Sequence, residues 1–203
     1  MKHQILIIHG GNAFDSYEDY LTDLRAKVVT LERLTAKDWK ATLGERLGSA
    51  FEVLIPRMPN AQNAKYLEWK IYFEKLLPLM DDGVVLVGHS LGGIFLAKYL
   101  AEETVSKKIR ATFLIAAPFT APEVEPLGDF LLPGNLEKLF TQSGELFFFQ
   151  SKDDQVVPYS NVKDYQKKLP NAHFTLVDGR GHFNDATFPE LEVALRTLSE
   201  RSV

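Results

Sequence analysis

A pentapeptide in the middle of the chain, Gly88-His89-Ser90-Leu91-Gly92, places a serine in the surroundings of a nucleophile. It has the form G-x-S-x-G, follows the apolar run Val84–Val87 and precedes a helical pattern over Leu91–Glu103. Between a strand and a helix, this spacing predicts a sharp turn that holds a serine hydroxyl clear of the backbone. The flanking glycines remove side chains that would collide across such a turn. The sequence therefore predicts Ser90 as a catalytic nucleophile.

A serine hydroxyl needs a base to accept its proton, and the predicted base is His182. It lies in Gly179-Arg180-Gly181-His182-Phe183, a glycine-rich stretch after the last predicted strand that can turn back toward Ser90. His173 is the rival, but it begins that strand and so belongs at the opposite end from the active edge. His89 lies inside the turn and faces the wrong way for a base.

The base needs a group that orients it, and the predicted acid is Asp154, in Asp153-Asp154-Gln155-Val156-Val157-Pro158. This stretch follows the fifth predicted strand, and the interval to His182 leaves room for one helix and one strand. The chain order Ser, Asp, His is the one that this type of turn uses. Asp153 is the alternative, although it could instead cap the turn, a frequent role of aspartate.

Two backbone amides are the predicted donors for a tetrahedral oxyanion. The first belongs to Leu91, the residue after the nucleophile, where the dipole of the following helix also favours negative charge. The second comes from His9-Gly10-Gly11-Asn12, directly after the first predicted strand, with Gly11 as the preferred donor and Asn12 as the alternative. His9 is expected to organise this loop through hydrogen bonds rather than to react.

These groups must be positioned by a sheet, and six short apolar runs predict its strands. Several runs are apolar without alternation, which is typical of parallel strands covered on both faces. We expect a single α/β domain over residues 1–203, with strand order 2-1-3-4-5-6, helices on both faces and a minimal cap or none. The six predicted strands are Ile5–His9, Phe51–Ile55, Val84–Gly88, Thr112–Ala116, Leu146–Gln150 and Phe174–Val177.

Two connections between these strands are long. Within residues 13–50, an apolar stripe from Tyr17 to Leu31 predicts one helix, and Thr35 with Asp38 resembles a capping box for a second. That second helix carries a stripe of Trp39, Leu43 and Leu47, and Gly48 can end it. The aromatic residues of 65–80 are expected in the core. The proline-rich residues 117–144 are either a short lid over the site or a long connection.

The composition limits the classes of partner. The chain has 203 residues and a net charge of −4, which argues against nucleic acid or an anionic membrane. It contains no cysteine, no signal-peptide pattern and no apolar run long enough for a membrane span, so a cytoplasmic protein is expected. A divalent ion held by His9, His89, Asp154 and His182 is conceivable. Because no H-E-x-x-H, P-loop or dinucleotide-binding motif is present, we expect no metal and no cofactor.

Four motifs occur in the order typical of a known superfamily. They are His9-Gly10-Gly11, the stretch 88–93, Asp153-Asp154 with Pro158, and Gly181-His182-Phe183. Together they resemble the α/β hydrolases. More narrowly, the chain resembles the small serine hydrolases related to retinoblastoma-binding protein nine. The resemblance extends from the first predicted strand to the last predicted helix, although residues 13–50 are longer than in the short members of that group.

The resemblance implies a Ser90–His182–Asp154 triad that hydrolyses small esters or amides. A non-catalytic protein-interaction module on the same scaffold is the alternative, since a fold does not determine a function. The residues identify no particular protein partner. The expected ligand is a small ester or amide substrate.

Overall fold

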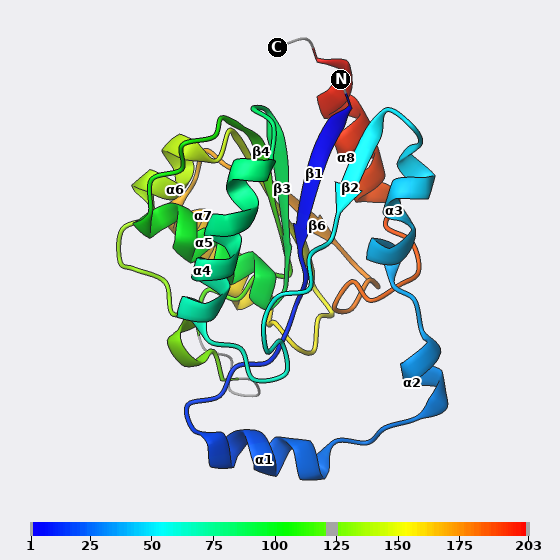
Figure 1. The fold of residues 1–203 in the computed structure, drawn as a ribbon, viewed down its shortest axis with the longest axis vertical. Helices are drawn as coiled ribbons and strands as arrows, with labels where there is room; N and C mark the ends of the chain where they lie inside the picture. Colours follow the sequence, from blue (N-terminus) through cyan, green and yellow to red (C-terminus); the bar gives the residue numbers. More distant parts are fainter. Residues whose placement is uncertain (1, 121–125, 202–203) are drawn as a thin grey trace.

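A parallel sheet of six strands forms the centre of the molecule. The computed structural model describes residues 2–120 and 126–201 (Figure 1). The strands lie in the order β2-β1-β3-β4-β5-β6, and every neighbouring pair is parallel. The predicted strand order and fold class are thus confirmed. The strands are β1 His3–Ile8, β2 Phe51–Leu54, β3 Val84–His89, β4 Ile109–Ile115, β5 Glu145–Ser151 and β6 His173–Val177.

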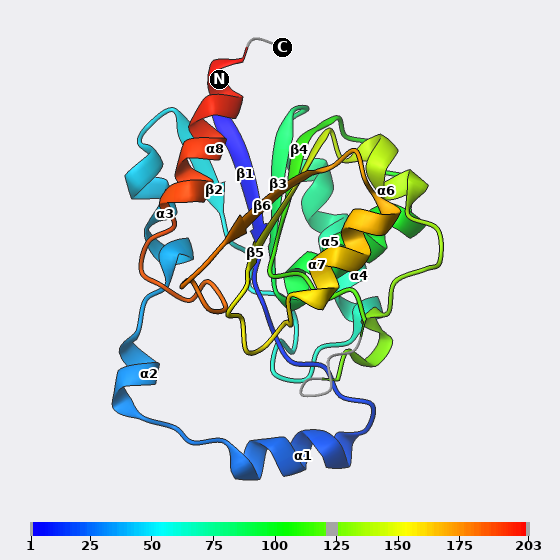
Figure 2. The ribbon, with the colours of Figure 1, turned by 180° about the vertical axis from the view of Figure 1, so that it is seen from behind.

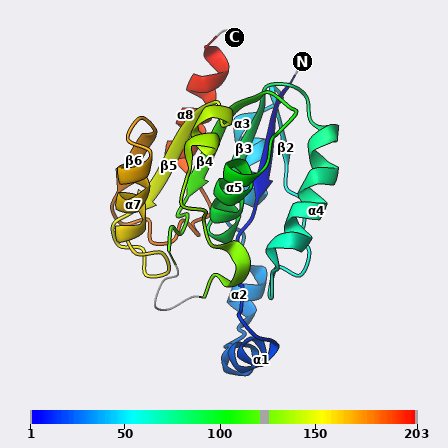
Figure 3. The same cartoon turned by 90° about the vertical axis from the view of Figure 1, so that its left-hand side faces the viewer.

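The described residues contain eight α-helices and two short 3-10 helices, all of which connect strands except α8, which follows the last strand. Helices α4 to α7 pack on one face of the sheet, while α3 and α8 pack on the other (Figures 2 and 3). The helices are α1 Tyr17–Ala26, α2 Leu31–Thr35, α3 Trp39–Leu47, α4 Tyr66–Leu76, η1 Leu77–Leu79, α5 Leu91–Glu102, η2 Gly128–Phe130, α6 Glu137–Gln142, α7 Ser160–Lys168 and α8 Pro189–Glu200.

The sheet separates two hydrophobic cores. The core under α4 and α5 contains Trp69, Phe73 and Phe95, whose rings meet edge to face. The core under α3 and α8 contains Trp39, which packs edge to face on Phe188. Burying each such side chain contributes about 1.5–3 kcal/mol. Strand β3 is buried along its whole length between the two cores, which explains its unbroken apolar sequence.

The strand register brings the carboxyl ends of the strands, where the predicted site residues lie, to one edge of the sheet. Ile8 pairs with Gly88, and His89 pairs with Ile115. The connection after β1 contains α3 on one face, whereas the connection after β3 contains α5 on the other. Adjacent parallel strands whose connections leave on opposite faces create a crevice at their carboxyl ends. The loop after β1 and the turn at Ser90 therefore face one another there.

The segment between β1 and α3 differs from the prediction. Helix α1 begins after Ser16, whose hydroxyl accepts from the Asp19 amide, but it ends at Ala26 rather than near Leu31. The β-branched residues that follow Lys27 explain the early end, because they disfavour helix. None of the residues of α1 is buried, and Leu31 in α2 is 77% exposed. In Figure 1, α1 and α2 stand apart from the layered body, so the predicted stripe does not pack on it.

Helix α3 begins differently from the predicted capping box. Thr35 is the last residue of α2 and does not cap the next helix. Asp38 is the cap of α3, and its carboxylate accepts from the Lys40 amide at 3.0 Å. The capping-box prediction was wrong because an aspartate adjacent to the first helical residue reaches the first-turn amides directly. The rest of the prediction holds: Trp39, Leu43 and Leu47 are buried, and the chain leaves the helix at Gly48 with φ 86°.

The described part of residues 117–144 packs against the body through scattered apolar residues. Phe130 is completely buried against Trp69, and Leu139 of α6 is buried in the same core. Phe119 packs edge to face on Tyr165 of α7. Residues 121–125, which form part of the segment predicted as a lid or connection, lie outside the described residues. None of the described helices combines the length and the hydropathy that a membrane span requires.

Candidate active site

The turn between β3 and α5 holds Ser90 in a strained conformation. Its φ is 56° and its ψ is −123°, a region that residues other than glycine rarely adopt. The Ser90 amide donates to the Ile115 carbonyl at 2.9 Å, and its own carbonyl accepts from the Gly93 amide at 2.8 Å. A β carbon on Gly92 would collide with the Ile8 carbonyl oxygen, so only glycine lets α5 start this close to β1. The tight packing on both sides maintains the strain at Ser90.

A cavity of about 430 Å³ opens beside this turn. Ser90 and His182 both line it, so two of the predicted catalytic residues share one cavity. The loop after β1 supplies Gly10 and Gly11, and the start of α3 supplies Lys40. Most of the lining residues have polar side chains, and Val156 is the one aliphatic side chain among them. The cavity therefore places the predicted nucleophile and base beside charged and amide side chains.

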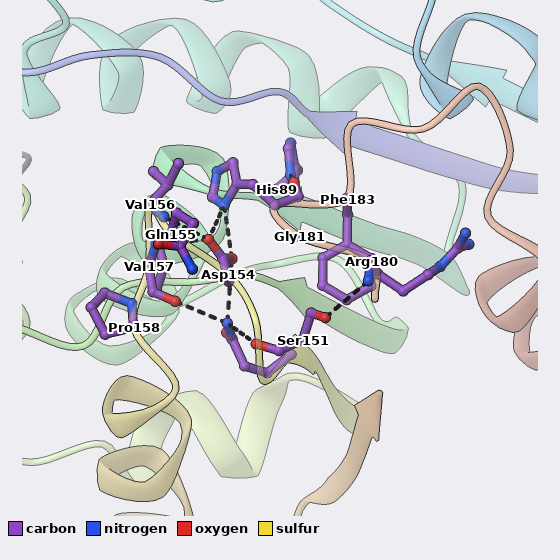
Figure 4. Close-up of polar contacts among 12 residues, drawn as sticks. His89, Ser151, Asp154, Gln155, Val156, Val157, Pro158, Arg180, Gly181 and Phe183 are labelled. Carbon is purple, nitrogen blue, oxygen red and sulfur yellow. Dashed lines mark hydrogen bonds and ion pairs between the residues drawn. The ribbon is translucent and has the colours of Figure 1, made fainter. Parts of the chain in front are cut away.

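The carboxylate of Asp154 contacts the imidazole of His182. Its two oxygens lie 3.1 and 2.9 Å from Nδ1, and the carboxylate is fully buried. One oxygen also accepts from the amides of Val156 and Val157, at 2.8 and 2.9 Å, as the dashed lines in Figure 4 show. These donors compensate the burial of a charge and hold the carboxylate in one orientation. His182 Nδ1 consequently carries a proton toward Asp154, which leaves the lone pair of the neutral ring on Nε2.

Asp153 points elsewhere, into the loop that precedes His182. Its carboxylate accepts from the Ser151 hydroxyl and from the amides of Gly179 and Gly181, at 3.1 and 3.3 Å. The hydrogen bond from Ser151 lowers the pKa of this exposed carboxyl. Of the two adjacent aspartates, the structure thus pairs Asp154 with His182, and Asp153 holds the backbone of the loop.

The loop after β1 approaches the nucleophile closely. A β carbon on Gly10 would lie 3.1 Å from Ser90 Cβ, and one on Gly11 would contact a methyl group of Leu91 at 3.4 Å. Within the described residues, the amides of Gly11 and Leu91 have no hydrogen-bond partner. The Asn12 amide already donates to the Ala61 carbonyl at 2.9 Å, so it is not available to an oxyanion in this arrangement.

His9 fixes this loop, as expected from the sequence. Its Nε2 accepts from the Met58 amide at 3.0 Å, and therefore its Nδ1 carries the proton and donates to the Gly10 carbonyl at 2.6 Å. His173 stacks on Phe147 at the amino end of β6, remote from the edge that carries Ser90. His9 thus holds the loop in place through hydrogen bonds. His173 lies at the opposite end of the sheet from Ser90 and cannot act as its base.

The Ser90 hydroxyl makes no hydrogen bond to any group in the described part of the chain, His182 included. Such contacts are often long without substrate and tighten only when substrate binds. The structure brings Ser90 and His182 to one cavity, and it joins His182 directly to the buried Asp154.

Sequence reasoning missed a charged pair beside His89. The Lys40 ammonium forms an ion pair with Asp38 at 2.5 Å and lies 3.3 Å from His89 Nδ1. His89 Nε2 in turn lies 2.8 Å from the His182 carbonyl oxygen. Burial lowers the pKa of His89 well below its ordinary value, and the charge of Lys40 lowers it further. No local pattern could have indicated this contact, because Lys40 and His89 are 49 positions apart.

The described residues contain no group of three or more histidine, aspartate or glutamate side chains arranged to hold a metal ion. His9 is instead hydrogen-bonded to Gly10 and Met58, His89 to Lys40 and the His182 carbonyl, and His182 to Asp154. Each of these imidazoles is thus hydrogen-bonded to other groups of the same chain.

The chain is similar to known proteins in both sequence and structure. The sequence is similar to that of YdeN of Bacillus subtilis (strain 168), with 25% identity over 98% of this chain and 96% of that protein. The crystal structure of the ydeN gene product from B. subtilis superimposes with a TM-score of 0.78 at 22% identity, over 98% of this chain and 100% of that one. A carboxylesterase structure from Nitrososphaera gargenis gives a TM-score of 0.61 at 15% identity, over 98% and 90% of the two chains.

These structural similarities establish a shared fold. The serine hydrolase family matches residues 31–200, a span that includes Ser90, Asp154 and His182. The matched span begins within α2 and continues through α8. The chain therefore belongs to the serine hydrolase family.

Proposed function

We propose that this protein hydrolyses small esters or amides through an acyl-enzyme intermediate, with Ser90 as nucleophile, His182 as base and Asp154 as the orienting acid. One observation carries the proposal. The buried Asp154 carboxylate lies 2.9 Å from Nδ1 of His182, and His182 lines the same cavity as Ser90. A buried carboxylate is costly unless it is paired, and here its partner is an imidazole at the cavity wall.

In the first half-reaction, Ser90 Oγ attacks the substrate carbonyl carbon while His182 Nε2 takes the hydroxyl proton. The resulting imidazolium is stabilised by Asp154, which stays ionised. The tetrahedral intermediate collapses when His182 returns the proton to the leaving alcohol or amine. Water then attacks the acyl-enzyme by the same route, and the acid product leaves Ser90 regenerated.

The negative charge of each tetrahedral intermediate needs donors, and the amides of Gly11 and Leu91 are the proposed pair. Both lack a partner within the described residues, and both lie next to the turn that carries Ser90. Leu91 is the first residue of α5, where the helix dipole also favours an anion. Removing one such donor in a hydrolase typically costs about 10²–10³ in kcat.

The polar cavity favours short acyl groups, as expected of a carboxylesterase-like enzyme. Asp38 and Lys40 line one part of it and Asn184 another, so a long alkyl chain would displace water from polar side chains without replacing its hydrogen bonds. The narrower similarity to relatives of retinoblastoma-binding protein nine is also part of this proposal. It rests on the small size of the chain and the short segment where larger relatives carry a cap, and it predicts the same choice of small substrates.

The proposal is tested with a fluorophosphonate probe and the intact mass of the folded protein. The wild-type chain should gain one phosphonyl group on Ser90, with loss of fluoride, and Ser90→Ala should gain none. Ser90→Ala should also lower the turnover of p-nitrophenyl acetate by at least about 10³-fold. Folded protein that neither reacts with the probe nor turns over any ester of a panel from acetate to decanoate would overturn the proposal and favour a non-catalytic binding module.

A further inference from the structure

The first turn of α3 holds the loop that carries His182. The Trp39 amide donates to the Asp185 carbonyl at 2.8 Å, and the indole Nε1 donates to the Phe183 carbonyl at 2.9 Å. The next residue, Lys40, reaches the same loop through His89. One helical turn thus determines the backbone position of three nearby residues, His182 among them.

Two groups besides His89 hold Lys40 in place. Its side chain is only 11% exposed, its ammonium pairs with Asp38 at 2.5 Å, and it lies 4.9 Å from the centre of the Trp39 ring. The carboxylate of Asp38 is itself fixed, because its other oxygen caps α3 through the Lys40 amide. Burial lowers the pKa of Lys40, while Asp38 acts in the opposite direction. An ammonium in this setting has a defined direction toward His89.

The proton positions of His89 follow from its two partners. The His182 carbonyl oxygen can only accept, so His89 Nε2 must carry a proton and donate to it. The Lys40 ammonium can only donate, so His89 Nδ1 must be unprotonated and accept from it. Lys40 therefore selects the one neutral tautomer of His89 that can hold the His182 backbone.

We propose that Lys40 is a positioning residue for the catalytic histidine: through His89, its ammonium fixes the carbonyl of His182 and hence the approach of the imidazole to Ser90. The proposal rests on the function proposed above. It assigns a role to a lysine that sits in the cavity wall without being a member of the triad. Loss of the ammonium would leave His89 free to adopt the other tautomer, which cannot donate to His182.

The kinetic test compares Lys40→Met with Lys70→Met. Lys70 is a matched control, since it also pairs with a carboxylate, Glu103, but lies on α4 away from the cavity. Lys40→Met should lower kcat by about 10–100-fold, the range expected when a catalytic group is displaced by about 1 Å. KM should stay within about twofold, and Lys70→Met should keep both constants. A raised KM with unchanged kcat would assign Lys40 to substrate binding and overturn the proposal.

A chemical rescue distinguishes the ammonium from the packing of the side chain. Because the chain has no cysteine, Lys40→Cys introduces a single thiol. Alkylation with 2-bromoethylamine displaces bromide and forms a thioether isosteric with lysine, whereas 1-bromopropane gives a neutral side chain of the same length. The aminoethyl form should recover most of the wild-type kcat, and the propyl form should stay at the level of Lys40→Met. Equal recovery with both reagents would refute the role of the ammonium.

The imidazole tautomers provide a readout that does not depend on turnover. In ¹⁵N-labelled wild-type protein, His89 should give the NMR pattern of a neutral ring protonated at Nε2, and Lys40→Met should lose it. An unchanged His89 pattern would overturn the proposal even if the wild-type protein proved inactive. An inactive wild-type protein whose Ser90 does not react with the probe would instead overturn the proposed hydrolysis. The two failures are therefore distinguishable.

Discussion

Replacing Asp154 with asparagine tests the proposed triad most directly, because the structure determines how the new amide must lie. The amides of Val156 and Val157 donate to Oδ1 at 2.8 and 2.9 Å. An asparagine keeps these two bonds only if its carbonyl oxygen takes the place of Oδ1. Its NH₂ group then takes the place of Oδ2, 2.9 Å from His182 Nδ1.

This orientation reverses the hydrogen bond to His182. The NH₂ group of the variant can only donate, so His182 Nδ1 would have to accept, and the ring proton would move to Nε2. A protonated Nε2 cannot take the proton of Ser90. The corresponding change in a serine protease triad lowers kcat by about 10⁴-fold. At about 1.36 kcal/mol for each tenfold change, the transition state would be destabilised by about 5.4 kcal/mol.

The assay measures kcat for p-nitrophenyl acetate with Asp154→Asn and with Asp153→Asn as its neighbour control. Asp153 is exposed, and an asparagine there keeps an oxygen for the amides of Gly179 and Gly181. The control should therefore lose less than about tenfold in kcat. A loss of less than tenfold in Asp154→Asn, or an equal loss in both variants, would refute the assignment of Asp154.

Two further predictions concern stability. Because burial lowers the pKa of His89 in the folded state, the unfolded chain takes up the proton first, near its ordinary pKa of about 6.5. The stability contributed by neutral His89 is full above about pH 6.5 and is lost below it, by up to about 1.4 kcal/mol per pH unit. Urea denaturation at pH 7.5 and 5.0 should show a smaller loss in His89→Gln than in wild type, and equal losses would contradict this reasoning. On the segment between β1 and β2, Leu31→Gln should change stability by less than about 0.5 kcal/mol, whereas Leu43→Ala should cost about 2–5 kcal/mol. Similar losses measured by thermal and urea unfolding for these two variants would show that α2 packs on the body.

Much of the architecture could be predicted from local sequence because its causes are local. A strand buried on both faces reads as an unbroken apolar run, as in Val84–Val87, and the six predicted strands alternate with helical patterns. The Ser90 turn is similarly visible, since the five residues of its G-x-S-x-G pattern lie directly between an apolar run and a helical pattern. These features depend on residues a few positions apart, so the sequence alone determined the fold class and the candidate nucleophile.

Other features depend on contacts between distant segments, and only the tertiary structure decided them. The stripe from Tyr17 to Leu31 indicates a helical face but not whether anything covers that face, and α1 buries none of its residues. Asp153 and Asp154 are adjacent and chemically alike, and the turn of the backbone alone directs one to the loop and the other to His182. The link from Lys40 through His89 joins α3, β3 and the last loop, which meet only when the sheet has assembled. A sequence encodes which side chains are present, whereas the direction of a carboxylate or an ammonium depends on packing that brings remote residues together.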